Sequence, residues 1–285
     1  MKININIESC IKCGKCVKVC PSSIFTRKSK GDAIDIINDE HCIGCAHCVD
    51  VCPTGSISHD LFPTERIHKI DYEDMPSPSQ MMNIIKARRS NRVLTTKPIP
   101  EEHLKLILEA ANCAPTATNS QSLSYTVITD PEKLKMVADY TIGVFDSLAK
   151  LLLNPAVKLI VKPFMKDVYK YVPMFNQLKE DHKAGKDPIL RGATALILIH
   201  TPKSNRFGSE DANLAYQNAS LMAQSLGISQ IYMGFVLTAI REDRGNGLGK
   251  TLHIDGAIKS VMALGIPAFN YGNYTDRKDV DVRYL

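Results

Sequence analysis

The chain has 285 residues, of which 44% are hydrophobic and 23% charged, an ordinary soluble composition with room for one large domain or two. Its net charge of +5 lies outside residues 1–60, which hold seven basic and seven acidic side chains. No Lys/Arg run or aromatic-basic platform accompanies this charge, so we expect no nucleic-acid partner.

The N-terminal segment contains two cysteine runs of identical spacing. Isoleucines alternate in short strand patterns at 3–7 and at 34–36. Eight of the nine cysteines lie in the first 52 residues, and both runs read C-x2-C-x2-C-x3-C-P. The runs are Cys10, Cys13, Cys16, Cys20 with Pro21, and Cys42, Cys45, Cys48, Cys52 with Pro53. Their repetition predicts an internally duplicated module.

This spacing resembles the bacterial ferredoxins that carry two [4Fe–4S] clusters. In such duplicated modules, the fourth ligand of each cluster comes from the other run. We therefore expect one cluster on Cys10, Cys13, Cys16 and Cys52, and the other on Cys42, Cys45, Cys48 and Cys20. His41 and His47 stand beside ligands, and we expect solvent-facing loop residues rather than groups that tune the clusters.

Two other uses of eight cysteines are weaker interpretations. Zinc prefers two separated C-x2-C pairs per site to triplets with a trailing Cys-Pro. Four disulfides in a secreted domain would explain neither the repeated spacing nor both prolines, and no signal-peptide pattern precedes the first run. Thiolate ligands imply a reducing compartment, so we expect a cytoplasmic protein.

A linker and a second domain follow. The Pro- and Ser-containing stretch 71–80 predicts a linker that ends in a helix N-cap. We therefore predict a cluster domain at 1–62, a linker at 63–79 and a second domain at 80–285. Helical patterns cover 79–89, 100–112, a segment from Pro131, and 211–226 with Gly227 as its stop. Strand patterns cover 125–129, 195–200, 231–235 and 261–264, so the class is α+β.

The segment 140–165 is the most apolar stretch of the chain. Asp146, Lys150, Lys158 and Lys162 argue against a membrane span, as does Pro155. We expect a helical hairpin packed on the domain, or a lid over a pocket, within an insertion around 136–190. An interfacial amphipathic helix is the alternative.

Two motifs of the second domain occur together. The first is Arg88-Arg89-Ser90-Asn91-Arg92, and the second is Ala114-Pro115-Thr116-Ala117-Thr118-Asn119-Ser120-Gln121. Together they resemble the N-terminal signatures of the nitroreductase family of FMN enzymes. The resemblance continues through Gln217-Asn218 and Leu226-Gly227 to Leu264-Gly265-Ile266-Pro267, and it covers residues 80–285.

The first motif has the chemistry that a flavin phosphate requires. Guanidinium groups and a hydroxyl suit a dianion, and alternating Arg88, Ser90 and Arg92 can face one way on an extended segment. By the resemblance, Arg88, Arg89, Ser90 and Arg92 hold the FMN phosphate, the ribityl chain or the pyrimidine edge of the flavin. Arg277 stands at the place of the family's C-terminal basic phosphate ligand. Thr275 replaces a lysine of many relatives, and Lys278 can share its contact.

The second motif implies an assembly. Pro115, Thr116, Asn119 and Gln121 match the family loop that reaches the flavin from the partner subunit, which implies an intertwined homodimer with two FMN sites. Met233 and Gly234 match the stretch whose backbone passes near the reactive flavin nitrogen. Met233 stands where relatives can carry a glutamate, a departure that bears on substrate and donor preference.

Two further features have ordinary interpretations. Cys113 lies outside both cysteine runs, and we expect a small helix residue packed inside rather than a redox thiol. The segment 245–251 is rich in glycine and ends in Lys250-Thr251, but Arg244 stands where a phosphate-binding loop needs its first glycine. We therefore expect a plain loop there.

The two halves together predict a flavin-dependent oxidoreductase of nitroreductase type. Clusters carry single electrons, whereas a flavin accepts electrons singly and releases them as a pair. We expect an external ferredoxin or similar reductase to charge the clusters, and FMN to reduce a small electron-poor acceptor such as a nitro compound, quinone or activated alkene. The flavin performs the chemistry in this family, so we predict no side-chain acid or base.

Two alternatives belong to other functional classes. One is an NAD(P)H-dependent nitroreductase whose clusters are accessory. The other is a non-enzymatic electron-transfer or sensor protein. Reduction by NADH or NADPH without ferredoxin distinguishes the first, and failure to bind FMN distinguishes the second.

Overall fold

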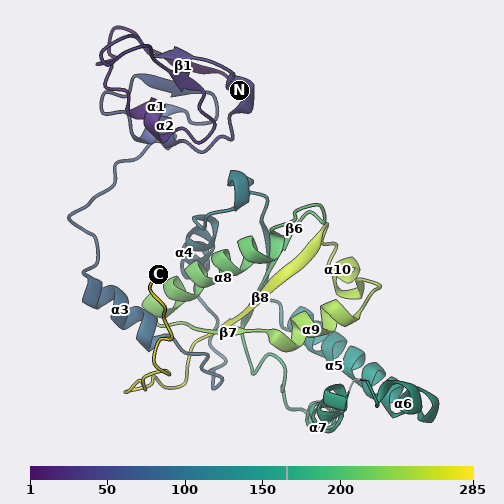
Figure 1. The fold of residues 1–285 in the computed structure, drawn as a ribbon. Helices are drawn as coiled ribbons and strands as arrows, with labels where there is room; N and C mark the ends of the chain where they lie inside the picture. Colours follow the sequence, from purple (N-terminus) through teal and green to yellow (C-terminus); the bar gives the residue numbers. More distant parts are fainter. Residues whose placement is uncertain (165) are drawn as a thin grey trace. The chain divides into compact units, whose positions relative to one another are not determined.

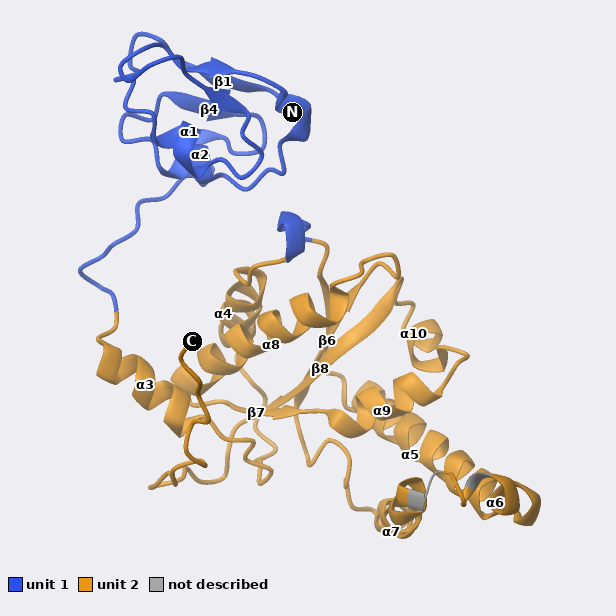
Figure 2. Ribbon diagram, in the orientation of Figure 1, with its two compact units in different colours: residues 1–75, 117–121 blue, residues 76–116, 122–285 orange. Residues whose placement is uncertain are grey.

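The computed structural model describes residues 1–164 and 166–285, which form two compact units. Unit 1 comprises Met1–Met75 with Ala117–Gln121, and unit 2 comprises Pro76–Thr116 with Ser122–Leu285 (Figure 2). Met165, the last residue of the predicted apolar segment, lies outside the described residues.

Unit 1 is built from two small antiparallel sheets and two short helices (Figure 1). Strand β1 (Ile3–Ile5) pairs with β4 (Ile57–His59), and β2 (Phe25–Thr26) pairs with β3 (Asp35–Ile36). Helices α1 (Lys15–Val19) and α2 (His47–Asp50) each contain the third cysteine of a run. The core residues are Ile3, Cys16, Ile24, Phe25, Cys48, Val49 and Ile57. A core this small leaves much of the stability to bound metal.

The sheet of unit 2 is fully antiparallel. Its strand order is β5-β6-β8-β7. The strands are β5 (Ser124–Ile128), β6 (Ala195–Thr201), β7 (Ser229–Tyr232) and β8 (Ala257–Gly265). Strand β6 lies second in the sheet and is buried on both faces, which explains the apolar run from Ala195 to Ile199.

Helices cover both faces of this sheet (Figure 1). Ala195, Ile197 and Ile199 of β6 share a core with α4 (Glu101–Asn112) and α8 (Gly208–Ser225). Leu196 and Leu198 share the other core with α5 (Pro131–Leu153), α7 (Val172–Lys183) and α9 (Gly234–Glu242). Further α-helices are α3 (Pro78–Ala87), α6 (Pro155–Val161) and α10 (Gly247–Thr251). Alternate residues of one strand thus serve two cores.

Helix α3 begins where the linker composition predicts a cap. Ser77 Oγ accepts the backbone N–H of Gln80 at 3.3 Å, and Gln80 Oε1 accepts the N–H of Ser77 at 2.8 Å. This reciprocal capping box, with Pro78 in the first turn, sets the start of the helix that leads into the Arg88 segment.

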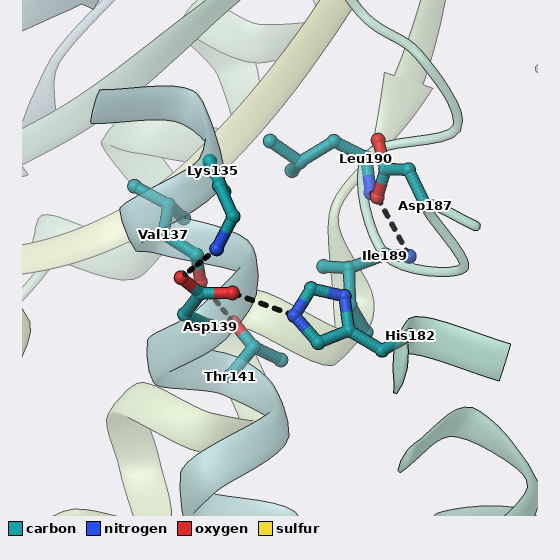
Figure 3. A network of polar contacts seen from close by, with 8 residues as sticks. All are labelled: Lys135, Val137, Asp139, Thr141, His182, Asp187, Ile189 and Leu190. Carbon is teal, nitrogen blue, oxygen red and sulfur yellow. Dashed lines mark hydrogen bonds and ion pairs between the residues drawn. The ribbon is translucent and has the colours of Figure 1, made fainter. Parts of the chain in front are cut away.

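Helices α5 and α7 pack together and form most of the predicted insertion. Phe145 and Phe175 stack with ring centroids 4.6 Å apart. Asp139 on α5 accepts from Lys135 at 2.6 Å and from His182 of α7 at 2.6 Å (Figure 3). Lys179 of α7 also donates to Asp146 at 2.7 Å. Of the helices in the described ranges, none combines the length and hydropathy needed to cross a bilayer.

Two predicted elements are wrong in type or extent. Strand β7 ends at Tyr232 rather than 235, and Gly234 begins α9, a helix that buries Val236 and Leu237 in the core. The predicted loop 245–251 contains α10. Asp243 accepts the Gly247 N–H at 2.7 Å and Leu248 enters the core, so the chain coils there.

Candidate functional site

The first cysteine-lined cavity of unit 1 lies among Cys10, Cys13, Cys16 and Cys52. Gly14 caps α1 with φ 73°, a left-handed conformation that lets the chain curve around the cavity. The N–H of Ser56 donates to Cys52 Sγ at 3.3 Å, and Thr54 Oγ1 lies 3.7 Å from the same sulfur. Three cysteines of the first run thus share a cavity with the last cysteine of the second.

The second cavity repeats this arrangement with the runs exchanged. Cys42, Cys45 and Cys48 line it together with Cys20. The N–H of Gly44 donates to Cys42 Sγ at 3.4 Å. His59, a residue absent from the sequence-based expectations, also lines the cavity. The ligand assignment is still a prediction, and these two lining sets are the observations that support it.

Burial disfavours the thiolate form of Cys16 and Cys48, the third cysteine of each run. Burial raises the pKa of Cys48 to about 11 and also raises the pKa of Cys16. Burial alone would raise the pKa of Cys52, but hydrogen bonds from Thr54 and Ser56 outweigh it, so this pKa is lowered. Iron would keep the buried sulfurs ionised, because metal ligation requires thiolates. Four sulfurs with amide donors around each cavity therefore fit a four-iron cluster.

In unit 2 the basic segment is held by a buried side chain. Asn91, 4% exposed, donates from Nδ2 to the carbonyl of Phe269 at 2.8 Å and accepts the N–H of Val93 at 3.0 Å. Ser229 Oγ of β7 donates to the Asn91 carbonyl at 2.9 Å. Arg88, Arg89 and Ser90 are half-buried, whereas Arg92 is exposed. Asn91 thus fixes the segment against β7 and the C-terminal segment.

The cationic groups of this segment are Arg88, Arg89 and Arg92. Within 1–164 and 166–285, no carboxylate forms an ion pair with Arg88, Arg89 or Arg92. Lys86 donates to the Tyr274 hydroxyl at 3.2 Å, which brings the end of α3 beside the C-terminal segment that contains exposed Arg277. Uncompensated guanidinium groups fit an anionic phosphate.

Two tyrosines connect this segment to the end of β7. The rings of Tyr216 on α8 and Tyr232 on β7 meet edge to face, with centroids 4.8 Å apart. Burial raises the pKa of Tyr216, and the positive charge of Arg88 acts in the opposite direction. Buried Met233 and exposed Gly234 follow directly and form the turn from β7 into α9. Arg88 thus lies within electrostatic range of Tyr216, and Met233 and Gly234 directly follow Tyr232 in the chain.

The predicted flavin loop is divided between the units. Pro115 and Thr116 belong to unit 2, whereas Asn119 and Gln121 belong to unit 1. Asn119 Nδ2 donates to the carbonyls of Ile43 and Gly44 at 3.1 and 2.8 Å. How this loop relates to the Arg88 segment stays a prediction. Cys113 was expected to be packed inside, which is wrong: it is exposed, because it caps α4 after the last turn that faces the core.

These features lie on a chain whose two parts match two known families. Residues 2–75 match the 4Fe-4S dicluster domain. Residues 85–266, more than half of the chain, match the nitroreductase family. The chain belongs to the nitroreductase family. Both resemblances drawn from the motifs are confirmed, and so is the α+β class.

Relatives within the nitroreductase family include an Archaeoglobus fulgidus protein named "Putative NADH dehydrogenase/NAD(P)H nitroreductase". It is 27% identical over 191 residues, which are 66% of this chain and 86% of the relative. An FMN-bound nitroreductase from Bacteroides fragilis is similar in structure, with TM-score 0.53, 22% identity and coverage of 72% and 97% of the two chains. A Desulfitobacterium hafniense nitroreductase with bound FMN gives TM-score 0.54 at 20% identity, with coverage of 72% and 97%. These structures establish the fold.

Sequence reasoning missed several residues of the nitroreductase unit. Asn91 lies inside the quoted motif, but nothing in the pattern separates its anchoring amide from the neighbouring phosphate candidates. Tyr216 and Tyr232 come from a helix and a strand, and only packing brings them together. Two other hollows, one at Lys135, His182 and Lys186 and one between α4 and β5, contain none of the predicted flavin residues.

Proposed function

We propose that this nitroreductase-family protein binds FMN and reduces a small electron-poor organic acceptor with electrons that pass through its own iron–sulfur clusters. The proposal is carried by one observation: two cavities, each lined by four cysteines, occur on the same chain as a nitroreductase fold. The bound FMN supplies the exchange between single electrons and electron pairs that joins such clusters to an organic acceptor.

The cysteines have defined tasks in this proposal. Cys10, Cys13, Cys16 and Cys52 hold one cluster, and Cys42, Cys45, Cys48 and Cys20 hold the other. The amides of Ser56 and Gly44 donate to ligand sulfurs and stabilise their negative charge. We propose that this cluster domain spans 1–62, with a linker at 63–79 and the flavin domain at 80–285.

The proposed task of the flavin-domain residues is to bind FMN and to orient it. Arg88, Arg89, Ser90 and Arg92 hold the phosphate or the polar edge of FMN, with Arg277 as a further cation. Support comes from guanidinium groups that have no carboxylate partner among the described residues, and from the buried amide of Asn91, which fixes their backbone. Pro115, Thr116, Asn119 and Gln121 complete the site of a partner subunit in a homodimer, and the backbone at Met233 and Gly234 lies at the flavin ring.

A nicotinamide donor is the second candidate. The Archaeoglobus fulgidus relative carries NAD(P)H nitroreductase in its name, and the match covers 66% of this chain. In that case NADH or NADPH would reduce the flavin directly, and the clusters would be accessory. The proposed class of acceptor is the same for a ferredoxin and for a nicotinamide as electron donor.

The test starts from protein purified without oxygen and assayed for iron, sulfide and FMN. We then expect acceptor reduction with a reduced ferredoxin and much slower reduction with NADH or NADPH. Nitroaromatic compounds, quinones and activated alkenes are compared as acceptors. Protein that binds clusters but no FMN, or that reduces none of these acceptors with either donor, contradicts the proposal.

A further inference from the structure

In the second cluster cavity an imidazole ring contacts a ligand sulfur, whereas in the first cavity the Thr54 hydroxyl does so. His59, at the end of β4, is 4% exposed, and its Nε2 lies 3.5 Å from Sγ of Cys42. The ring packs against Phe62, with centroids 4.9 Å apart. Cys42 Sγ is thus contacted both by the backbone amide of Gly44 and by a ring nitrogen of His59.

The other ring nitrogen determines where the proton lies. His59 Nδ1 accepts the N–H of Leu61 at 3.1 Å, which leaves the proton of a neutral ring on Nε2. Nδ1 also lies 3.1 Å from Asp60 Oδ1. With the Leu61 N–H on Nδ1, Nε2 carries the hydrogen and donates to Cys42 Sγ.

The internal duplication provides a comparison within the molecule. The runs repeat with an offset of 32 residues, Cys10 to Cys42, so Arg27 occupies in the first copy the place that His59 occupies in the second. The Arg27 guanidinium donates to the Lys12 carbonyl at 3.4 Å and lies where a Cβ of Gly14 would stand. The equivalent positions thus contact a backbone carbonyl in one copy and a ligand sulfur in the other.

We propose that His59 is a positioning residue that raises the reduction potential of the cluster held by Cys42, Cys45, Cys48 and Cys20. Reduction adds one electron, taken from a reduced ferredoxin, to a cluster and its thiolates, and no bond is made or broken. A hydrogen bond to a ligand sulfur stabilises the added negative charge, so it lowers the free energy of the reduced cluster more than that of the oxidised cluster. His59 therefore makes this cluster easier to reduce.

The inference rests on the cluster binding of the proposed function. The test is an anaerobic potentiometric titration of the full chain, monitored by electron paramagnetic resonance, with iron and sulfide measured beforehand. His59→Phe keeps a ring beside Phe62 but removes the donor, whereas His59→Gln keeps an N–H. His41→Leu is the control, because His41 neighbours Cys42 in sequence but is exposed.

We expect one of the two potentials to fall in His59→Phe, to stay closer to wild type in His59→Gln, and not to move in His41→Leu. If the Phe variant assembles no clusters, His59→Leu takes its place in the same comparison. Unchanged potentials with full iron content, or an equal fall of both potentials, overturn the inference. Wild-type protein without iron overturns the proposed function instead.

Discussion

At the scale of single residues, both copies of the cluster module repeat the same unusual backbone. Three pairs of positions, 32 residues apart, have positive φ: Lys12 and Gly44, Gly14 and Ala46, Ser23 and Gly55. Each pair contains one glycine and one residue with a Cβ, for which this conformation is costly. The repeated turns let the chain curve around a cluster. The positive φ is therefore kept even at residues with a Cβ, which do not favour it.

Ala46→Gly is expected to stabilise the cluster domain by about 0.5–1 kcal/mol, because φ at Ala46 is 63° and glycine tolerates this value without a Cβ penalty. The measurement is the guanidinium midpoint of the cluster absorbance without oxygen. Gly14→Ala, at the equivalent position, is the reverse change. It must lower the midpoint, since φ at Gly14 is 73° and a side chain there is strained. A lower midpoint in Ala46→Gly contradicts this account.

Asn91→Ala is expected to destabilise unit 2 by about 2–3 kcal/mol, since the Phe269 carbonyl and the Val93 N–H lose their partner. Urea unfolding measures this loss. FMN retention should fall as well, because the neighbouring arginines lose their fixed backbone. Ser229→Ala removes one hydrogen bond to the same segment and should cost less. Undiminished FMN affinity in Asn91→Ala would show that this anchor does not organise the site.

At the scale of elements, ion pairs join α5 to α7. Partial burial of Asp139 alone would raise its pKa, but the hydrogen bonds from Lys135 and His182 outweigh it, so the pKa is lowered. The hydrogen bonds from Lys150 and Lys179 lower the pKa of Asp146. A carboxyl with a lowered folded pKa stabilises the fold above its unfolded pKa. That stabilisation is lost as pH falls through the folded value.

Asp139→Asn should therefore reduce the free energy of unfolding near neutral pH by less than about 1 kcal/mol, the size typical of exposed ion pairs. The difference from wild type should disappear as pH falls below about 4, where unfolded carboxyl groups bind protons. Urea unfolding at several pH values measures it, with His182→Gln as a variant that removes one donor. A difference that grows as pH falls would contradict this assignment.

The sequence pattern predicted some elements well for reasons that particular residues show. The apolar run at 195–200 became β6 because both of its faces are buried, and Ser77 and Gln80 formed their cap locally. The end of β7 and the start of α9 were misjudged, because a continuous apolar stretch does not show where a strand ends and a helix begins. The tyrosine pair and His59 depend on contacts between distant segments, which a single sequence cannot reveal.

At the scale of the whole molecule, the chain combines a duplicated metal module with a flavoprotein fold. The exchange of the fourth cysteine couples the two copies, because each cavity contains sulfurs from both runs. Loss of one run would thus disturb both clusters. The nitroreductase unit has its own two cores, so its fold has a basis independent of the metal.

Paired cysteine variants test this exchange by iron content. Cys10→Ala with Cys52→Ala should remove one cluster and leave about four irons per chain. Cys10→Ala with Cys20→Ala should remove ligands from both clusters and leave almost none. Exposed Cys113→Ala is the control and should keep about eight irons. If the first pair loses both clusters and the second pair only one, each run holds its own cluster.

The central claim, that electrons reach the flavin through the clusters, is tested most directly by anaerobic stopped-flow absorbance of flavin reduction. Wild-type protein is compared with the Cys10→Ala, Cys20→Ala double variant, with FMN content matched. The account predicts fast flavin reduction by a reduced ferredoxin in wild type, a large loss of rate in the variant, and slow reduction by NADH and NADPH in both. Equal rates with ferredoxin in both proteins, or fast reduction by a nicotinamide irrespective of the clusters, would contradict it.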